Sequence, residues 1–188
     1  GALFIQFLYS DDIEYEDKGA VVAKISTNGS FSVSWSTRIT LESTPGTIFS
    51  GEMSANDTYL FLGVRTDGGA GVVALARDAG SSAWQASVSG PGNAVFDVGG
   101  AADGYLALGG FANTGDGDNT AVACIPDVGT AGTYGAFDVT SASFVGSTGS
   151  AALTGTSFTG TTNTGYLART TFATTGSYTP EVVVYPQD

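Results

Sequence analysis

The chain has 188 residues and a net charge of -12, and glycine supplies 28 residues while only 13% are charged. Its 18 acidic residues against six basic ones give a surface that repels phosphate backbones, which excludes nucleic acid as a partner. Thr, Ser, Val and aromatic residues are common, whereas Lys and Glu, which favour helices, are rare. This composition predicts an all-β protein of short strands joined by tight turns.

Several kinds of functional site are excluded by residue types that the chain lacks. It contains no histidine, so Ser-His-Asp catalysis, Cys-His catalysis and His-based metal centres are impossible. Glycosidase chemistry needs two carboxylates at a set separation, and no pattern pairs Asp97, Asp103 or Asp138 in this way. No apolar run approaches the length of about 20 residues that spans a membrane. We therefore expect a protein that is not an enzyme, has no cofactor and has no membrane span.

The first predicted elements are three strands, at residues 3–8, 20–25 and 32–41. The chain enters the first strand, "ALFIQFLYS", without an initiator Met or a signal peptide, so we expect a processed product or a segment of a longer chain. The loop after this strand is the most acidic stretch, "SDDIEYEDKG", and contains Asp11 and Asp12. The third strand follows a turn at Asn28–Gly29 and carries Trp35.

Two further stretches repeat this arrangement and add one leading strand each. Their strands are predicted at residues 46–51, 58–64, 71–77 and 83–89, and then at 93–98, 105–111, 120–125 and 134–140. Asn56–Asp57 and Asp103–Gly104 favour hairpin turns between the first two strands of each stretch. Gly80–Ser81 and Gly132–Thr133 favour turns before the last strand.

Cys124 is the single cysteine of the chain and lies in the strand predicted at residues 120–125. A lone cysteine forms no internal disulfide. Its neighbours Val122, Ala123 and Ile125 are apolar, and unpaired cysteine is among the most buried residue types. We therefore expect a buried structural thiol.

The last quarter of the chain is a weaker copy that is rich in Thr and Gly. Its strands are predicted at residues 143–147, 151–157, 165–171 and 178–185, with a turn at Gly176–Ser177. The first copy lacks a leading strand, which leaves an unpaired edge of main-chain N–H and C=O groups. We expect residues 3–8 or 181–185 to pair with a neighbouring chain or segment by strand addition.

An aromatic residue after each of these turns marks the period of the repeat. The four residues are separated by 49, 50 and 44 positions and are Trp35, Trp84, Tyr134 and Tyr178. Self-similarity of this kind is typical of repeat architectures. The copies cover approximately residues 1–44, 45–91, 92–141 and 142–188 of a single domain.

Each copy has the size of one β-propeller blade, with four short antiparallel strands in about 47 residues. The predicted fold is therefore all-β and β-propeller-like, and a β-sandwich or β-solenoid is the alternative. Because a single blade cannot bury both of its faces, we expect the four aromatic residues to be packing anchors between neighbouring repeats. A surface that stacks ligands is the alternative role for these rings.

The acidic loops between the second and third strands of each copy are expected on one rim of the molecule. In "NTGDGDNTA", Asp116 and Asp118 resemble part of a calcium loop, and Asp11 and Asp12 lie in the equivalent loop of the first copy. The spacing lacks the further acids and the distal Glu of an EF-hand. A solvated acidic rim is the preferred interpretation, and a calcium site is the alternative.

One motif resembles the Gly-rich β-propeller-like repeats of marine bacteriophage and cyanophage virion proteins. The motif consists of Val21, Val22, Ala23, Lys24, Ile25, Gly29 and Trp35, together with a "YLxLGG" strand as at residues 105–110. The later copies depart from it, because Leu75 and Cys124 stand at the place of Lys24.

This resemblance implies a structural component of a virion, such as a tail fibre, a tail nozzle or a capsid decoration, and supplies no catalytic residues. Its location would be extracellular, in the virion. Its partners would be copies of itself, other virion proteins and a glycan of the host surface. The alternative is a bacterial secreted or cell-surface β-propeller that binds carbohydrate, since exposed Tyr, Asn and Thr side chains suit glycan recognition.

Overall fold

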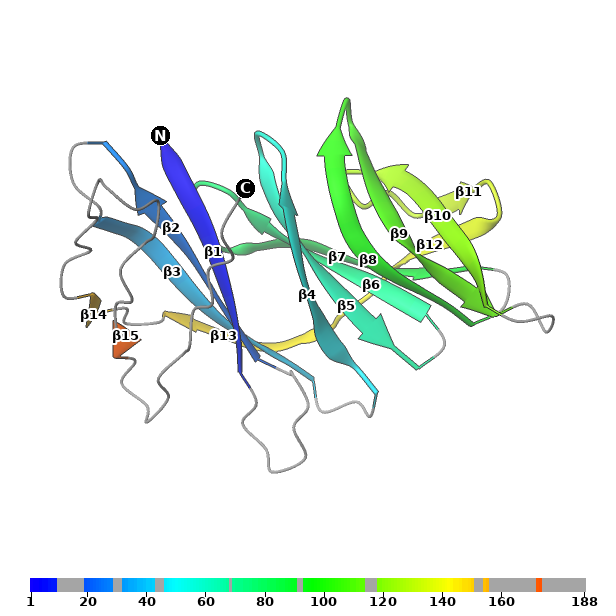
Figure 1. Ribbon diagram of the computed structural model, residues 1–188, viewed down its shortest axis with the longest axis horizontal. Coiled ribbons are helices and arrows are strands. Elements are labelled where there is room, and N and C mark those ends of the chain that lie inside the picture. Colours follow the sequence, from blue (N-terminus) through cyan, green and yellow to red (C-terminus); the bar gives the residue numbers. More distant parts are fainter. Residues whose placement is uncertain are drawn as a thin grey trace, which may run out of the picture.

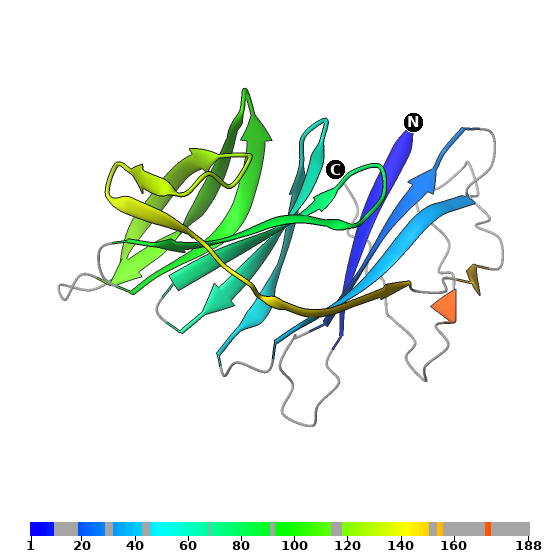
Figure 2. The ribbon, with the colours of Figure 1, turned by 180° about the vertical axis from the view of Figure 1, so that it is seen from behind.

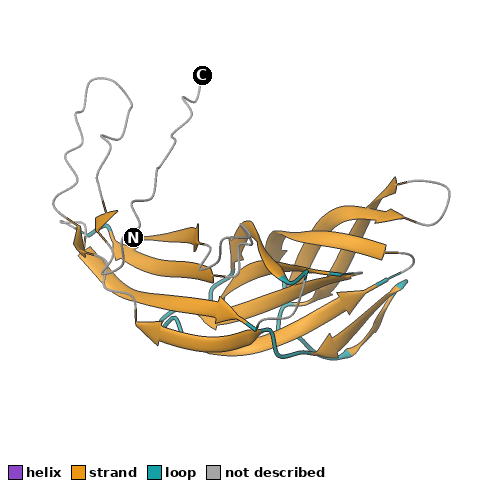
Figure 3. Ribbon diagram, turned by 90° about the horizontal axis from the view of Figure 1, so that it is seen from below, coloured by secondary structure: helices purple, strands orange, loops and turns teal. Residues whose placement is uncertain are grey.

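The computed structural model describes residues 1–9, 19–28, 32–42, 46–67, 69–90, 93–113, 118–150, 154–155 and 172–173. Every regular element in these ranges is a strand, as Figure 3 shows, so the all-β prediction is confirmed. The described part of the chain accordingly has no helix that is long and apolar enough to cross a membrane.

Three antiparallel sheets are stacked one on the next as successive layers (Figure 1). The first sheet has the order β1-β2-β3-β13 and consists of β1 (Ala2–Tyr9), β2 (Gly19–Ser26), β3 (Ser32–Leu41) and β13 (Val145–Ser150). The middle sheet has the order β11-β12-β7-β6-β5-β4 and consists of β4 (Ile48–Ala55), β5 (Tyr59–Thr66), β6 (Gly69–Ala76), β7 (Ser82–Ser89), β11 (Gly132–Tyr134) and β12 (Phe137–Ser141). The last sheet has the order β10-β9-β8 and consists of β8 (Asn93–Ala102), β9 (Tyr105–Asn113) and β10 (Asp118–Pro126). A short separate pair joins β14 (Thr154–Gly155) to β15 (Phe172–Ala173).

Ten strands predicted from the sequence, from residues 3–8 to residues 120–125, correspond to β1 through β10. The two hairpin turns are confirmed as well. Asp103 and Gly104 have φ angles of 53° and 83°, the left-handed conformation that this type of two-residue hairpin turn requires. At the other turn, the Asn56 side chain accepts hydrogen bonds from the backbone N–H groups of Thr58 and Tyr59, at 2.8 and 2.7 Å.

The segment after β10 differs from the prediction in two ways. The turn predicted at Gly132–Thr133 is wrong, because Gly132 begins β11 and the turn is made by Gly129, with a φ of 64°. The strand predicted at 134–140 is interrupted by Gly135, which also has a φ of 64°. The chain therefore turns back there, and β12 pairs with β7 of the middle sheet.

One segment, residues 137–150, crosses the outer edges of two sheets, as Figure 2 shows from behind. Its first part, β12, pairs with β7, and its second part, β13, pairs with β3. Between them the backbone N–H groups of Phe144 and Val145 donate to the Gln85 side-chain oxygen, at 2.6 and 3.0 Å. This crossing segment forms the edge strand of the first sheet, and in the middle sheet it lies between β7 and the outermost strand, β11. Among the described strands, β10 of the last sheet is paired with β9 alone.

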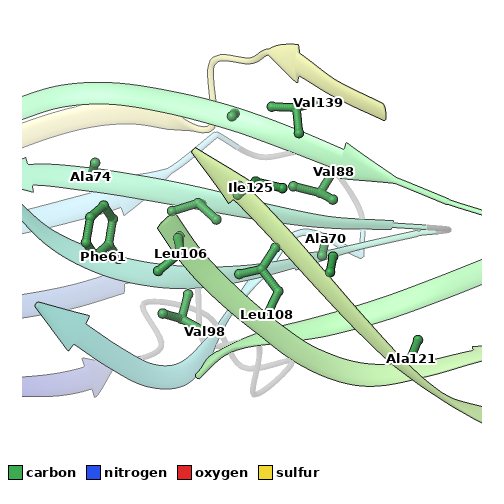
Figure 4. Close-up of a cluster of buried hydrophobic side chains, with 13 residues drawn as sticks. Phe61, Ala70, Ala74, Val88, Val98, Leu106, Leu108, Ala121, Ile125 and Val139 are labelled. Atoms are coloured by element: carbon green, nitrogen blue, oxygen red, sulfur yellow. The ribbon is translucent and has the colours of Figure 1, made fainter. Parts of the chain in front are cut away.

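The middle sheet is covered on both faces, which explains the continuous apolar runs in its strands. On β5, Leu60 and Leu62 face the first sheet, while Phe61 faces the last sheet, as the alternation of a strand requires. Figure 4 shows the second of these interfaces, where Leu106 and Leu108 of the last sheet lie over the middle sheet. The apolar area removed from water in these two interfaces is the main favourable contribution to folding.

The described strands form open sheets that do not close into a barrel or a ring. Most of the fourth copy, residues 156–171 and 174–188, lies outside the described residues, as does the acidic loop at 10–18. β1 forms one edge of the first sheet, as expected for a copy without a leading strand. The contact of this edge with another chain stays a prediction.

Candidate interaction surface

The outer face of β9 and β10 is the most exposed apolar surface among the described residues. In the described part of the chain six large apolar residues are exposed, and four of them lie on the last sheet or in the turn that follows it: Tyr105, Phe111, Val122 and Val128. The other two lie on the first sheet. Clustering of this kind marks an interaction site more often than single exposed apolar residues do.

The register of β9 and β10 defines the residues that share this face. Antiparallel partners lie on the same side of a sheet, and alternate pairs lie on opposite sides. Five pairs lie on the outer side: Tyr105 with Pro126, Ala107 with Cys124, Gly109 with Val122, Phe111 with Thr120 and, at the far end of the two strands, Asn113 with Asp118. We call the eight residues of the first four pairs the outer face. The intervening residues Leu106, Leu108 and Ile125 are buried against the middle sheet.

None of these eight residues is charged, although the chain has a net charge of -12; the nearest acidic residues on this side are Asp118 at the end of β10 and Asp97 of β8, opposite Gly109. The outer face is also open. The side chain of Val122 is 66% exposed, and a β-carbon at Gly109 would meet no neighbouring atom within 4 Å among the described residues. A neutral, open and apolar face can gain stability only by being covered.

Cys124 lies on this outer face and is exposed, so the prediction of a buried thiol is wrong. The sequence comparison placed Cys124 at the position of Leu75, but the two strand pairings show a shift by one residue. Leu75 pairs with Leu60, and the corresponding pair in the last sheet is Ile125 with Leu106. A shift by one residue moves a side chain to the other face of a sheet.

Two of the four predicted anchors make the same contact with the next sheet. Trp35 on β3 packs on Gly80, in the turn between β6 and β7, and Trp84 on β7 packs on Gly129, in the turn after β10. A β-carbon at either glycine would overlap the indole ring, and both glycines have positive φ. The Trp35 indole N–H also donates to the Arg77 carbonyl oxygen, at 3.2 Å.

The other two predicted anchors differ from this pattern. Tyr134 lies at the margin of the core between the middle and last sheets, and its hydroxyl donates to the Thr130 carbonyl oxygen at 3.0 Å. Tyr178 lies outside the described residues. Of the three described anchors, Trp35 and Trp84 therefore share one kind of contact, and Tyr134 makes a different one.

Ion pairs and hydrogen bonds also connect neighbouring sheets. Arg65 on β5 donates to both carboxylate oxygens of Asp97 on β8, at 3.3 and 2.8 Å. Its hydrogen bond to Asp97 raises the pKa of Arg65, an effect that partial burial opposes. The Lys24 ammonium on the first sheet pairs with Asp78, which follows β6 of the middle sheet, at 3.1 Å. These exposed pairs orient the layers and contribute little stability.

The calcium candidates remain untested by the structure. Asp11, Asp12 and Asp116 lie outside the described residues, and Asp118 begins β10 with a side chain that is not described. Within the described ranges, no group of three or more acidic or cysteine side chains is placed to hold a metal ion.

Sequence reasoning did not find the outer face. Apolar residues occupy both faces of β9 and β10, as they do in the middle sheet, so the sequence does not indicate which face is covered. Comparison with known proteins adds no further guide, since no family model, no curated protein and no solved structure matches the chain significantly.

Proposed function

We propose that the chain is a non-enzymatic structural protein of a virion, part of a tail fibre, a tail nozzle or a capsid decoration. Its partners would be copies of itself or other virion proteins, and host attachment would follow from exposure at the particle surface. The observation that carries the assembly role is the uncharged apolar outer face at one end of the layered sheets. The viral assignment rests on the resemblance of residues 21–35 and 105–110 to virion repeats.

We further propose that the three sheets are successive units of a β-propeller-like repeat. The repeated Trp–Gly contact supports this proposal, because Trp35 and Trp84 are 49 residues apart, as are Gly80 and Gly129. A contact that recurs at a fixed period is expected when each unit packs only on its neighbours. A structure of the whole chain in its assembled form would test whether the units close into a ring.

Mass spectrometry of purified particles tests the viral assignment. We expect peptides of the chain to copurify with capsid and tail proteins through density-gradient separation, and its gene to lie among capsid and tail genes. Recovery of the peptides only from secreted or cellular fractions would contradict the assignment. An intact-particle control treated with protease would show whether the protein is exposed at the virion surface.

A carbohydrate-binding protein of a bacterial surface is the second candidate, and one observation favours it. Tyr105 and Phe111 are 54% and 46% exposed on the outer face, where sugar rings could stack on their aromatic rings. A glycan array separates the two candidates. Tight binding of one sugar class that is lost in Tyr105→Ala would favour the carbohydrate role, and an array without binding would favour the assembly role.

A further inference from the structure

We propose that the outer face is a self-association surface, on which the last sheets of two copies of this chain stack face to face. The proposal names the partner and the contact residues, and it concerns the isolated protein. It rests on the assembly role proposed above and specifies its partner and contact, and it can hold or fail separately from the viral assignment. Three features support it: the last sheet lies at the end of the layers, its outer face lacks charged residues, and the surface shape of that face is complementary to itself.

The first feature is continuity with the way the chain packs its own sheets. Among the described residues, the last sheet is packed on the middle sheet through Leu106, Leu108 and Ile125, and its other face is uncovered. Val72 in the middle sheet pairs with Gly63 and is fully buried, whereas Val122 pairs with Gly109 in the same way and is 66% exposed. The position that a further layer covers in the middle sheet is thus open in the last sheet. Another sheet of the same kind fits this position.

The second feature is charge. Two copies that each carry a net charge of -12 repel one another over most of their surfaces. The eight residues of the outer face include no acidic residue. Two acidic residues lie at its margins by register: Asp97 of β8, opposite Gly109, is paired with Arg65, and Asp118 lies at the far end of β10. Nor does the outer face contain a basic residue that would attract a partner of opposite charge. A second copy that presents the same neutral face is therefore a better fit than a strongly charged partner.

The third feature is the surface shape of the outer face. Ala107 and Gly109 form a low strip along β9, and Val122 stands beside it on β10. A two-fold axis through this region would place Val122 of each copy over the low strip of the other, so that a single patch is complementary to itself. Filling such gaps with apolar side chains is how packed interfaces gain most of their stability.

Sedimentation velocity over a range of concentrations tests the proposal. We expect the wild-type chain to pass from a species of 18.9 kDa to one of twice that mass as its concentration rises. Val122→Lys places a charge in the contact and should raise the dissociation constant at least tenfold, or about 1.4 kcal/mol. Val33→Lys is the matched control, because Val33 is also exposed, at 40%, but lies on the first sheet. It should leave the dissociation constant unchanged.

A second variant removes the gap without adding charge. Gly109→Leu fills the low strip, and the open space above Gly109 means that the fold itself should tolerate the side chain. We expect a folded protein, by circular dichroism and melting temperature, with self-association weakened to a similar extent. A wild-type chain that stays monomeric at every concentration would overturn the proposal. Equal effects of Val33→Lys and Val122→Lys would overturn it too, because they would place the contact elsewhere.

Cys124 reports on the same face, because it is the single cysteine and lies beside Ala107. Its reaction rate with an aromatic disulfide reagent should fall as the concentration passes through the dissociation constant, and Val122→Lys should abolish this fall. A thiol that reacts slowly at all concentrations in a monomeric protein would show that the same chain covers the face. A thiol whose rate is constant while dimers form would show that they use another surface. Either result would refute the proposal, and neither would bear on whether the protein comes from a virion.

Discussion

The middle and last sheets place the same local structure in two different environments. In both, a strand that begins with Tyr-Leu pairs with a strand rich in Ala and Val, and a valine lies opposite a glycine. Val72 of the middle sheet is fully buried, whereas Val122 of the last sheet is 66% exposed. Strand sequence and pairing are therefore not sufficient to determine burial. The presence of a neighbouring layer determines it.

The largest expected effect comes from placing a charge at these two valines. Val72→Asp buries an unpaired carboxylate between two sheets and should cost about 4 kcal/mol or more in the free energy of unfolding, enough to prevent folding. Val122→Asp should change it by about 0.5 kcal/mol or less when measured at low concentration, because the site is exposed. Urea denaturation of both variants measures the difference. Similar losses in both would contradict the layered description.

A second effect isolates the contact between Trp84 and Gly129. Gly129→Ala adds strain at a φ of 64° and also overlaps the indole ring, and we expect a loss of about 2 to 4 kcal/mol. Gly135→Ala has the same φ of 64° and meets no neighbouring atom within 4 Å, so it should lose only the part due to strain, about 1 to 2 kcal/mol. The difference between their thermal unfolding free energies measures the overlap. Equal losses would mean that the ring moves aside without cost.

A third effect concerns the crossing segment, which pairs with β7 and with β3 but, among the described strands, not with the last sheet. Gln85→Leu keeps the volume of the side chain but removes the acceptor for the N–H groups of Phe144 and Val145. Leaving these groups without a partner should cost about 1 to 3 kcal/mol. Hydrogen exchange at the two amides should accelerate in the variant, whereas exchange in β9 should not change. Unchanged protection at both amides would show that Gln85 does not hold the segment.

The strands of the first three copies could be predicted from the sequence because their signals are local. Apolar runs and the Asp103–Gly104 turn each act within a few residues. The departure of β12 to the middle sheet could not be predicted, because pairing with β7 is a contact between residues about fifty positions apart. The outer face was missed for a related reason. A strand such as β10 is apolar on both faces, and nothing within it indicates which layer is the last.

The smallest expected effect tests whether polar pairs or apolar packing join the middle sheet to the last. Asp97→Asn keeps the shape of the side chain but removes the charge that pairs with Arg65, whose side chain is 44% exposed. Exposed pairs of this kind typically contribute about 1 kcal/mol or less, and salt screens them. We therefore expect a loss of at most about 1 kcal/mol in urea denaturation, which should shrink further in high salt. A loss as large as that of Gly129→Ala would mean that the ion pair, and not the apolar interface, holds the last sheet in place.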